Sequence, residues 1–133
     1  MIDLHPTTCN ICGGKVIYTD NSAVYGKSYG NNKIYLCTEC GAYIGVNKER
    51  PDEALGLLAN HQMRKLKKRC RDEFDKLWKY KKTEQEKRTA RREAYKWLAK
   101  EMKVSDKDCN FGYFDLRQLS VALSLINKMN NGG

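Results

Sequence analysis

The fold of the N-terminal part is decided by two short stretches, Cys9-Asn10-Ile11-Cys12-Gly13-Gly14 and Cys37-Thr38-Glu39-Cys40-Gly41. In each stretch two residues separate the cysteines, a spacing that lets both sulfurs reach one ion at about 2.3 Å. The second cysteine of each pair is followed by glycine, which we expect to adopt a positive φ at the tight turn. The pattern therefore predicts two zinc knuckles that share one ion.

Four cysteine ligands fill a tetrahedral site, whereas a catalytic zinc keeps one position open for water or substrate. We therefore predict one structural Zn²⁺ held by Cys9, Cys12, Cys37 and Cys40. Two unrelated turns with free thiols, or a dithiol redox pair, are the alternatives that the spacing leaves open. His5 precedes the first knuckle, and we expect it to be a neighbour of the site rather than a ligand.

Short runs of β-branched and aromatic residues lie around the cysteines. Residues 15–19 (KVIYT), 33–36 (KIYL) and 42–46 (AYIGV) are each typical of a strand. A meander this short buries too little apolar area to be stable alone, so the ion must supply much of the stability. We predict a zinc-ribbon lobe over residues 1–50.

The loop between the first two predicted strands contains Tyr25, Lys27 and Tyr29, and a glycine follows each tyrosine. One interpretation is a stacking surface for bases, with Lys27 close to the phosphates. The other is that the tyrosines pack the small lobe against the helices. The sequence favours the second interpretation, because packing aromatic residues are commoner than stacking surfaces.

After Pro51 the apolar pattern changes to the helical period. Residues 60–79 place Met63, Leu66, Cys70, Phe74, Leu77 and Trp78 on one stripe. Thr83-Glu84-Gln85-Glu86 predicts a capping box that opens a second helix, and Asp115 is placed to cap a last one. The first two helices are expected to form a basic antiparallel hairpin. The predicted fold class is α+β: a four-cysteine zinc ribbon packed with a three-helix region over residues 51–133.

The net charge of +9 is concentrated in the helices. Between residues 61 and 103, seventeen basic side chains meet only seven acidic ones, more than a solvated surface requires. The excess predicts low-specificity contact with the phosphates of DNA or RNA, although an inert basic face is the alternative. The candidate contact residues are Arg64, Lys65, Lys67, Lys68, Arg69, Arg71, Lys87, Arg88, Arg91, Arg92, Lys96, Tyr25, Lys27 and Tyr29.

A catalytic arrangement is not apparent in the sequence. Asp72, Glu73 and Asp75 are close together, but on a helix they point in different directions, and no histidine stands beside a nucleophile. We therefore expect a binding protein and not an enzyme.

Compartment and thiol chemistry follow from composition. No run approaches the roughly 18 apolar residues of a membrane span, and residues 1–10 lack the basic-then-apolar pattern of a signal peptide. We expect a cytoplasmic protein with reduced thiols and no membrane partner. Cys70 and Cys109 are expected to pack in the core. A second metal site made from these two thiols and His61 is the less favoured alternative.

Seven stretches resemble an uncharacterised family of small bacterial and phage proteins described as containing a zinc-finger domain. In chain order they are CNICGGKV (9–16), VYGKSYG (24–30), YLCTECGAYIGV (35–46), LGLLAN (55–60), RDEFDKLW (71–78), AYKWLA (94–99) and CNFGYFD (109–115). The resemblance implies that the zinc lobe and the helices belong to one unit, but it supplies no activity.

The chain departs from the family pattern at positions 47, 70 and 110, which are often histidine in that pattern and are Asn47, Cys70 and Asn110 here. These three differences weaken any hypothesis of a second metal site or a catalytic imidazole. The phage members suggest an alternative function, a protein-interaction module of phage or mobile-element origin that binds and modulates a host protein. The oligomeric state stays open.

Overall fold

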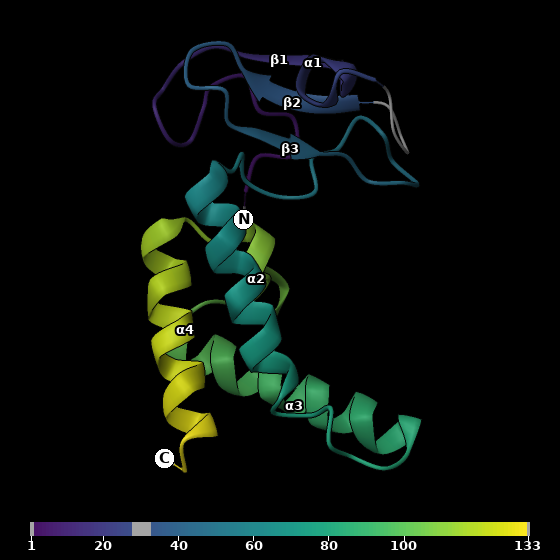
Figure 1. Ribbon diagram of the computed structural model, residues 1–133. Helices are drawn as coiled ribbons and strands as arrows, with labels where there is room; N and C mark the ends of the chain where they lie inside the picture. The colour runs from purple at the N-terminus through teal and green to yellow at the C-terminus, as the bar shows by residue number, and fades with distance from the viewer. Residues whose placement is uncertain (1, 28–32, 133) are drawn as a thin grey trace. The chain divides into compact units, whose positions relative to one another are not determined.

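The computed structural model describes residues 2–27 and 33–132 (Figure 1). Contacts divide the chain into two compact units, Met1–Gln62 and Met63–Gly133, here called the N-terminal unit and the helical unit. The elements are β1 (Val16–Asp20), α1 (Ser22–Tyr25), β2 (Lys33–Cys37), β3 (Tyr43–Gly45), α2 (His61–Asp75), α3 (Glu84–Met102), the 3₁₀ turns η1 (Asp106–Asp108) and η2 (Phe111–Tyr113), and α4 (Leu116–Asn130). The α+β class is therefore confirmed.

The N-terminal unit contains an antiparallel sheet in the order β1-β2-β3. β1 pairs with β2 from Val16 opposite Cys37 to Asp20 opposite Lys33. Because the strands follow the β-branched and aromatic runs, each predicted strand lies within one residue of its expected bounds. The register also places Cys37 at the end of the central strand, beside the loop that carries the first knuckle.

The core of the N-terminal unit is small. One cluster of buried side chains in it contains Cys9, Val16, Tyr35, Cys37, Ala42, Val46, Ala54 and Leu58, and Ile34 and Ala59 are buried as well. Two of the cysteines that were predicted as ligands are thus core residues as well. Because so few large apolar side chains contribute, this core cannot by itself offset the entropy lost when the unit folds.

The segment after β3 belongs to the N-terminal unit, although the change in composition at Pro51 suggested a boundary there. Val46 bridges Ala54, and Tyr43 bridges Ala59 with hydrogen bonds of 3.2 and 3.0 Å between their backbones. The segment thereby continues the antiparallel pairing beyond β3. The division by contacts consequently falls after Gln62, in the first turn of α2.

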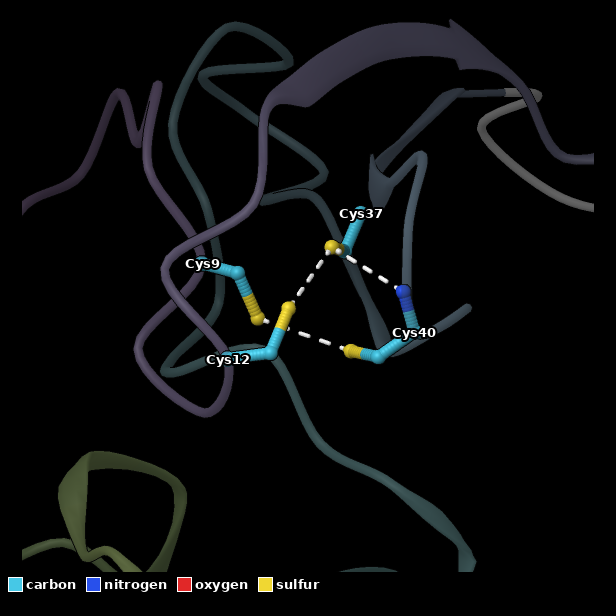
Figure 2. A group of neighbouring side chains, drawn as sticks. All are labelled: Cys9, Cys12, Cys37 and Cys40. Atoms are coloured by element: carbon cyan, nitrogen blue, oxygen red, sulfur yellow. Dashed lines mark hydrogen bonds between the residues drawn. The ribbon is translucent and has the colours of Figure 1, made fainter.

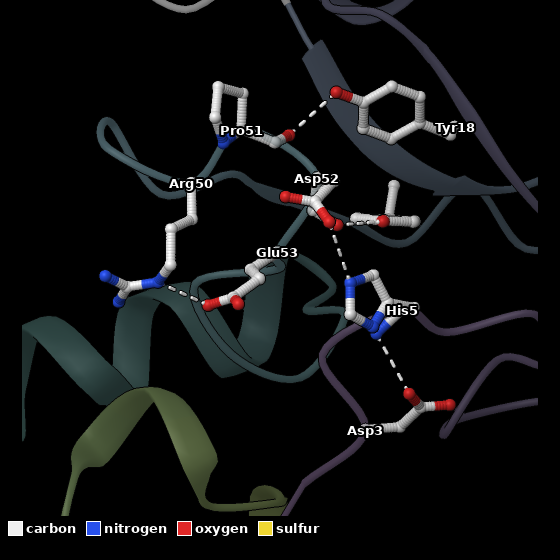
Figure 3. A network of polar contacts seen from close by, with 8 residues as sticks. Asp3, His5, Tyr18, Arg50, Pro51, Asp52 and Glu53 are labelled. Carbon is white, nitrogen blue, oxygen red and sulfur yellow. Dashed lines mark hydrogen bonds and ion pairs between the residues drawn. The ribbon is translucent and has the colours of Figure 1, made fainter.

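A polar network holds the loop around residue 52 against the rest of the N-terminal unit (Figure 3). His5 Nε2 lies 3.2 Å from an Asp52 carboxylate oxygen. The Tyr18 hydroxyl donates to the Pro51 carbonyl at 2.7 Å, and the Tyr35 hydroxyl donates to the Asp52 carbonyl. The His5 side chain is thus engaged in a surface contact with Asp52, as expected of a residue that is not a metal ligand.

In the helical unit α4 runs alongside α2, and α3 lies across both (Figure 1). The Cys70 thiol of α2 donates to the Leu119 carbonyl of α4 at 3.4 Å, and Asn130 of α4 donates to the Glu73 carbonyl at 2.9 Å. The basic antiparallel hairpin expected from α2 and α3 is therefore wrong. The chain leaves the helix after Asp75 through successive turns, and these turns redirect it before α3 begins.

Aromatic side chains fill the space between the helices of this unit. The Phe74 ring of α2 lies 4.4 Å from the Tyr95 ring of α3 and 5.5 Å from Phe111 of η2, measured between centroids. Phe111 in turn contacts Phe114 edge to face at 6.1 Å. Phe74 and Phe114 are each 1% exposed, so this cluster is part of the buried core of the helical unit.

Helices α3 and α4 start after their predicted capping residues, Thr83 and Asp115. The Thr83 hydroxyl accepts from the Glu86 amide at 3.1 Å and so caps α3. Asp115 and Gln118 form a reciprocal capping box at the start of α4, with bonds of 2.8 and 3.0 Å. These caps satisfy amides that have no partner inside the helix.

Among the described residues, no helix has the length and apolar character needed to cross a bilayer.

Candidate functional site

Four cysteine sulfurs meet at one end of the sheet (Figure 2). Cys9 and Cys12 come from the loop before β1, Cys37 ends β2, and Cys40 lies in the turn before β3. All four Sγ atoms lie within 4.8 Å of one another. Cys9 Sγ is 3.7 Å from Cys40 Sγ, and Cys12 Sγ is 3.5 Å from Cys37 Sγ.

This geometry fits a tetrahedral zinc. With Zn–S bonds of about 2.3 Å, the sulfurs of a tetrahedral site are about 3.8 Å apart, close to the two separations observed. Backbone amides point at the same sulfurs: Ile11 N–H donates to Cys9 at 3.3 Å, and Gly14 N–H donates to Cys12 at 3.3 Å. Such donors stabilise thiolates. The four cysteines are positioned to hold one metal ion, as a structural zinc site requires.

The pKa values of the cysteine thiols also favour a bound cation. The amide of Cys40, and then that of Glu39, lower the pKa of the Cys37 thiol to about 6. The Gly14 amide lowers the pKa of Cys12, but the Cys37 sulfur, burial and the other two sulfurs together raise it to about 12. Thiolates this close repel one another, so all four ionise together only around a positive ion. A four-sulfur site has no open position, which makes the ion structural.

Glycines shape both knuckles. Gly13 and Gly41 have φ angles of +78° and +79°, so the prediction of positive φ after each second cysteine is confirmed. Gly14 has a different reason to be glycine. A Cβ at this position would lie 3.0 Å from Cys37 Sγ and 2.7 Å from an oxygen of Glu39. Position 14 needs glycine because the backbone passes close to the Cys37 sulfur and the Glu39 side chain. This contact forms only in the folded structure, so the sequence does not indicate it.

Asn10, inside the first knuckle, was not singled out by the sequence analysis. Its side chain donates to the Leu58 carbonyl at 3.0 Å and accepts from the Leu58 amide at 2.9 Å. This pair of bonds ties the first knuckle to the segment that leads into α2. The contact joins residues 48 positions apart, so no local pattern could have indicated it.

The two remaining thiols lie in the helical unit. Cys70 is fully buried, and burial raises its pKa to about 11. Cys109 donates to the Tyr95 carbonyl at 3.6 Å, and its pKa is also raised to about 11, mainly by burial. Among residues 2–27 and 33–132 the only group of potential metal ligands is the four-cysteine cluster. Cys70 and Cys109 therefore have the environment of packing residues.

The candidate basic residues fall into different surroundings. Lys67 is 8% exposed, and burial followed by repulsion from Arg71 and Arg64 lowers its pKa, so its side chain is not offered to a ligand. Lys68 pairs with Asp72 at 3.0 Å, and Lys87 lies 3.6 Å from Glu84. Lys65 and Arg69 are exposed on α2.

Five of the candidates converge on one hollow. Arg71 of α2 and Arg88, Arg91, Arg92 and Lys96 of α3 line a groove of about 780 Å³, here called the arginine groove. Tyr95, Cys109, Asn110 and Phe111 complete its walls, and Asp106 is its one acidic residue. Among the described residues none of the four guanidinium groups forms an ion pair. The sequence located the charges, but it did not predict that these five share a cavity.

Arg91 is held by aromatic rings. Its guanidinium lies 5.2 Å from the centroid of Tyr95 and 5.7 Å from that of Trp78, both within cation–π range. The Trp78 indole N–H is buried and has no hydrogen-bond partner in the described part of the chain. Stacking of this kind orients a guanidinium while leaving its N–H groups able to donate to a ligand.

The tyrosine loop is only partly described. Tyr25 lies edge to face with Tyr43, at 6.0 Å between centroids, and is 49% exposed. Lys27 is exposed, and Tyr29 lies outside the described residues. Tyr25 thus packs within the N-terminal unit while keeping half of its surface open.

Comparisons with known proteins agree with the metal site. No curated protein and no solved structure matches the chain significantly. One family model does match, and it covers residues 5–129, which include all four cysteines and all but the end of α4. The chain belongs to the family described as a zinc-finger-containing domain.

Proposed function

We propose that the chain is a non-catalytic nucleic-acid-binding protein that contacts phosphates through its helical unit. The observation that carries this proposal is the arginine groove, which is lined by four arginines that form no ion pair with any described residue. The four arginines are exposed, and like charges gathered on one surface repel one another unless an anion neutralises them. A groove of this composition therefore favours an anionic ligand over an apolar one.

Arginine is suited to phosphate in particular. Its planar guanidinium donates two parallel hydrogen bonds to phosphate oxygens and keeps its charge at every physiological pH. Contacts of this kind fix a nucleic acid in place but do not read its bases. We accordingly propose binding of low sequence specificity, to DNA or RNA.

The zinc site has a separate role in this proposal. Because its four sulfurs fill the coordination sphere, the ion holds the N-terminal unit folded and offers no position to a substrate. In this proposal Tyr25, half exposed beside Tyr43, adds stacking contact from the N-terminal unit. The function thus combines a structural metal with a basic binding surface.

The test is a binding titration of the zinc-loaded chain against labelled 12-residue oligonucleotides, single- and double-stranded, of DNA and RNA. The logarithm of the affinity should fall linearly with the logarithm of salt concentration, by about 0.7 to 0.9 for each phosphate neutralised. If none of the four types binds at low salt, the proposal is wrong. Capture of an acidic host protein from nuclease-treated lysate would then support the protein-interaction alternative.

A charge-reversal pair locates the surface. Arg88→Glu, Arg91→Glu and Arg92→Glu, combined, should abolish binding, because they place carboxylates in the groove. Lys65→Glu, Lys68→Glu and Arg69→Glu, combined, make the same change in net charge on an exposed part of α2. This control should weaken binding much less. Equal losses in the two variants would show that net charge alone, and not the groove, drives binding. Zinc content and circular dichroism must stay unchanged in both.

A further inference from the structure

The basic side chains that line the arginine groove come from one face of α3 and from α2. Arg88, Arg91 and Arg92 occupy positions i, i+3 and i+4 of α3, so they share one face within a single turn. Arg71 reaches the same cavity from α2, and Lys96 adds a further charge one turn along α3. Two helices therefore contribute five exposed basic side chains to the lining of one groove of about 780 Å³.

The balance of charge in this cavity suggests the kind of phosphate it binds. Asp106 is the one carboxylate among the lining residues, so the cavity keeps a clear positive excess. A phosphodiester carries a single negative charge and two free oxygens. A phosphomonoester carries about −1.5 to −2 near neutral pH and offers three oxygens at one point. The second group matches several converging guanidinium groups better than the first.

We infer that the arginine groove binds a phosphomonoester, supplied either by the terminal phosphate of a nucleic-acid strand or by a free nucleotide. The inference rests on the same groove as the proposed function and deepens it. A strand would be held by its end, and its remaining phosphates would lie over the basic residues outside the cavity. The stacking of Arg91 on Tyr95 and Trp78 pre-orients one of the donors.

The experiment compares 12-residue oligonucleotides of one sequence that end in a 5′-phosphate, in a 3′-phosphate or in hydroxyls only. We expect one of the phosphorylated forms to bind the zinc-loaded chain roughly tenfold more tightly than the hydroxyl form, as an added set of charge-assisted hydrogen bonds implies. Equal affinity for all three forms would overturn the inference and leave the proposed function standing.

Free nucleotide distinguishes the two sources of the phosphate. If adenosine monophosphate displaces the phosphorylated oligonucleotide at micromolar concentration, the groove recognises the nucleotide itself. If only phosphorylated oligonucleotides compete, it recognises a strand end, and both results support the inference. Binding of the monophosphate with no oligonucleotide binding would support the inference and refute the proposed function. Absence of binding by every ligand would refute both.

Matched variants assign the effect to the groove. Arg88→Gln with Arg92→Gln should reduce the preference for phosphate from about tenfold to about one. Arg69→Gln with Arg117→Gln removes the same charge from residues outside the groove and should keep the preference. A preference that persists in the first variant, or vanishes equally in both, would contradict the assignment. Thermal unfolding and zinc content establish that each variant is folded.

Discussion

The N-terminal unit and the helical unit obtain their stability from different sources. The N-terminal unit has a short sheet, a core that includes Cys9 and Cys37, and two knuckles shaped around one ion. The helical unit has a cluster of aromatic rings centred on Phe74 and helices closed by side-chain caps. The N-terminal unit has few apolar side chains, so metal coordination must supply much of its stability. The helical unit has more of them and does not depend on a metal in this way.

Removing the metal should have the largest effect on this difference between the two units. Cys37→Ser should lose the zinc and unfold the N-terminal unit, because zinc coordination contributes on the order of 10 kcal/mol in small zinc domains. The helical unit should stay folded. Elemental analysis should find about one zinc per wild-type chain and none in the variant. Hydrogen exchange, followed by mass spectrometry, should show protection lost before residue 60 and kept in α3 and α4.

Cys70→Ser is the matched control, because it removes a thiol that lies outside the cluster. It should retain one zinc per chain. Two zincs in the wild type, of which this control loses one, would mean that the thiols of the helical unit also bind metal.

The helical unit should respond to its core and not to zinc. Phe74→Ala removes the ring at the centre of the aromatic cluster and should destabilise this unit by about 3 to 5 kcal/mol. Urea unfolding followed by helical circular dichroism measures the change. Tyr80→Ala, at a position that is 69% exposed, should change stability by less than about 0.5 kcal/mol. Loss of zinc in Phe74→Ala at low urea would show that the two units are not independent in stability.

Asn10→Ala tests whether the first knuckle supports the segment before α2. It removes two hydrogen bonds to the backbone of the buried Leu58 and should cost about 2 kcal/mol. The rate of zinc loss to a chelator should rise accordingly. Asn47→Ala is the matched control, since the Asn47 side chain also forms two hydrogen bonds to the backbone, here by accepting from the amides of Glu49 and Arg50 in an exposed loop where water can replace it. Similar rates in the two variants would count against this role for Asn10.

The smallest expected effect concerns the start of α3. Thr83→Ala removes the cap on the Glu86 amide and should destabilise the helical unit by about 1 kcal/mol. Thr83→Ser keeps an oxygen at the same place and should restore most of the loss. Thermal unfolding followed at 222 nm measures both. No difference between alanine and serine would mean that water satisfies the amide equally well.

Local chemistry was predictable from the sequence. The cysteine spacing identified the ligands, and the glycines after Cys12 and Cys40 have the positive φ that a tight turn needs. Thr83 and Asp115 also cap their helices as predicted, and the reciprocal bonds of a capping box are present at Asp115. In each case the residue and its partner are at most four positions apart, or belong to a repeated motif, so the physical requirement is visible in the chain itself.

The features that the sequence did not predict depend on contacts between residues far apart in the chain. The change of composition at Pro51 does not coincide with the division by contacts, because Asn10, Tyr43 and Val46 pair with residues beyond it. Leu77 and Trp78 continue the helical period, yet the chain turns after Asp75. The arginine groove needs α2, α3 and the 3₁₀ segments in their folded places, which periodicity cannot supply.

The position of Arg91 over Trp78 has a practical consequence. The chain has two tryptophans, Trp78 and Trp97, and both belong to the helical unit. Indole fluorescence should therefore not change when zinc is removed, but it should change when an anion binds the Arg91 guanidinium that lies over the Trp78 ring. In the Trp97→Phe variant all indole emission comes from Trp78. Its fluorescence can therefore be used to measure ligand binding without an added label.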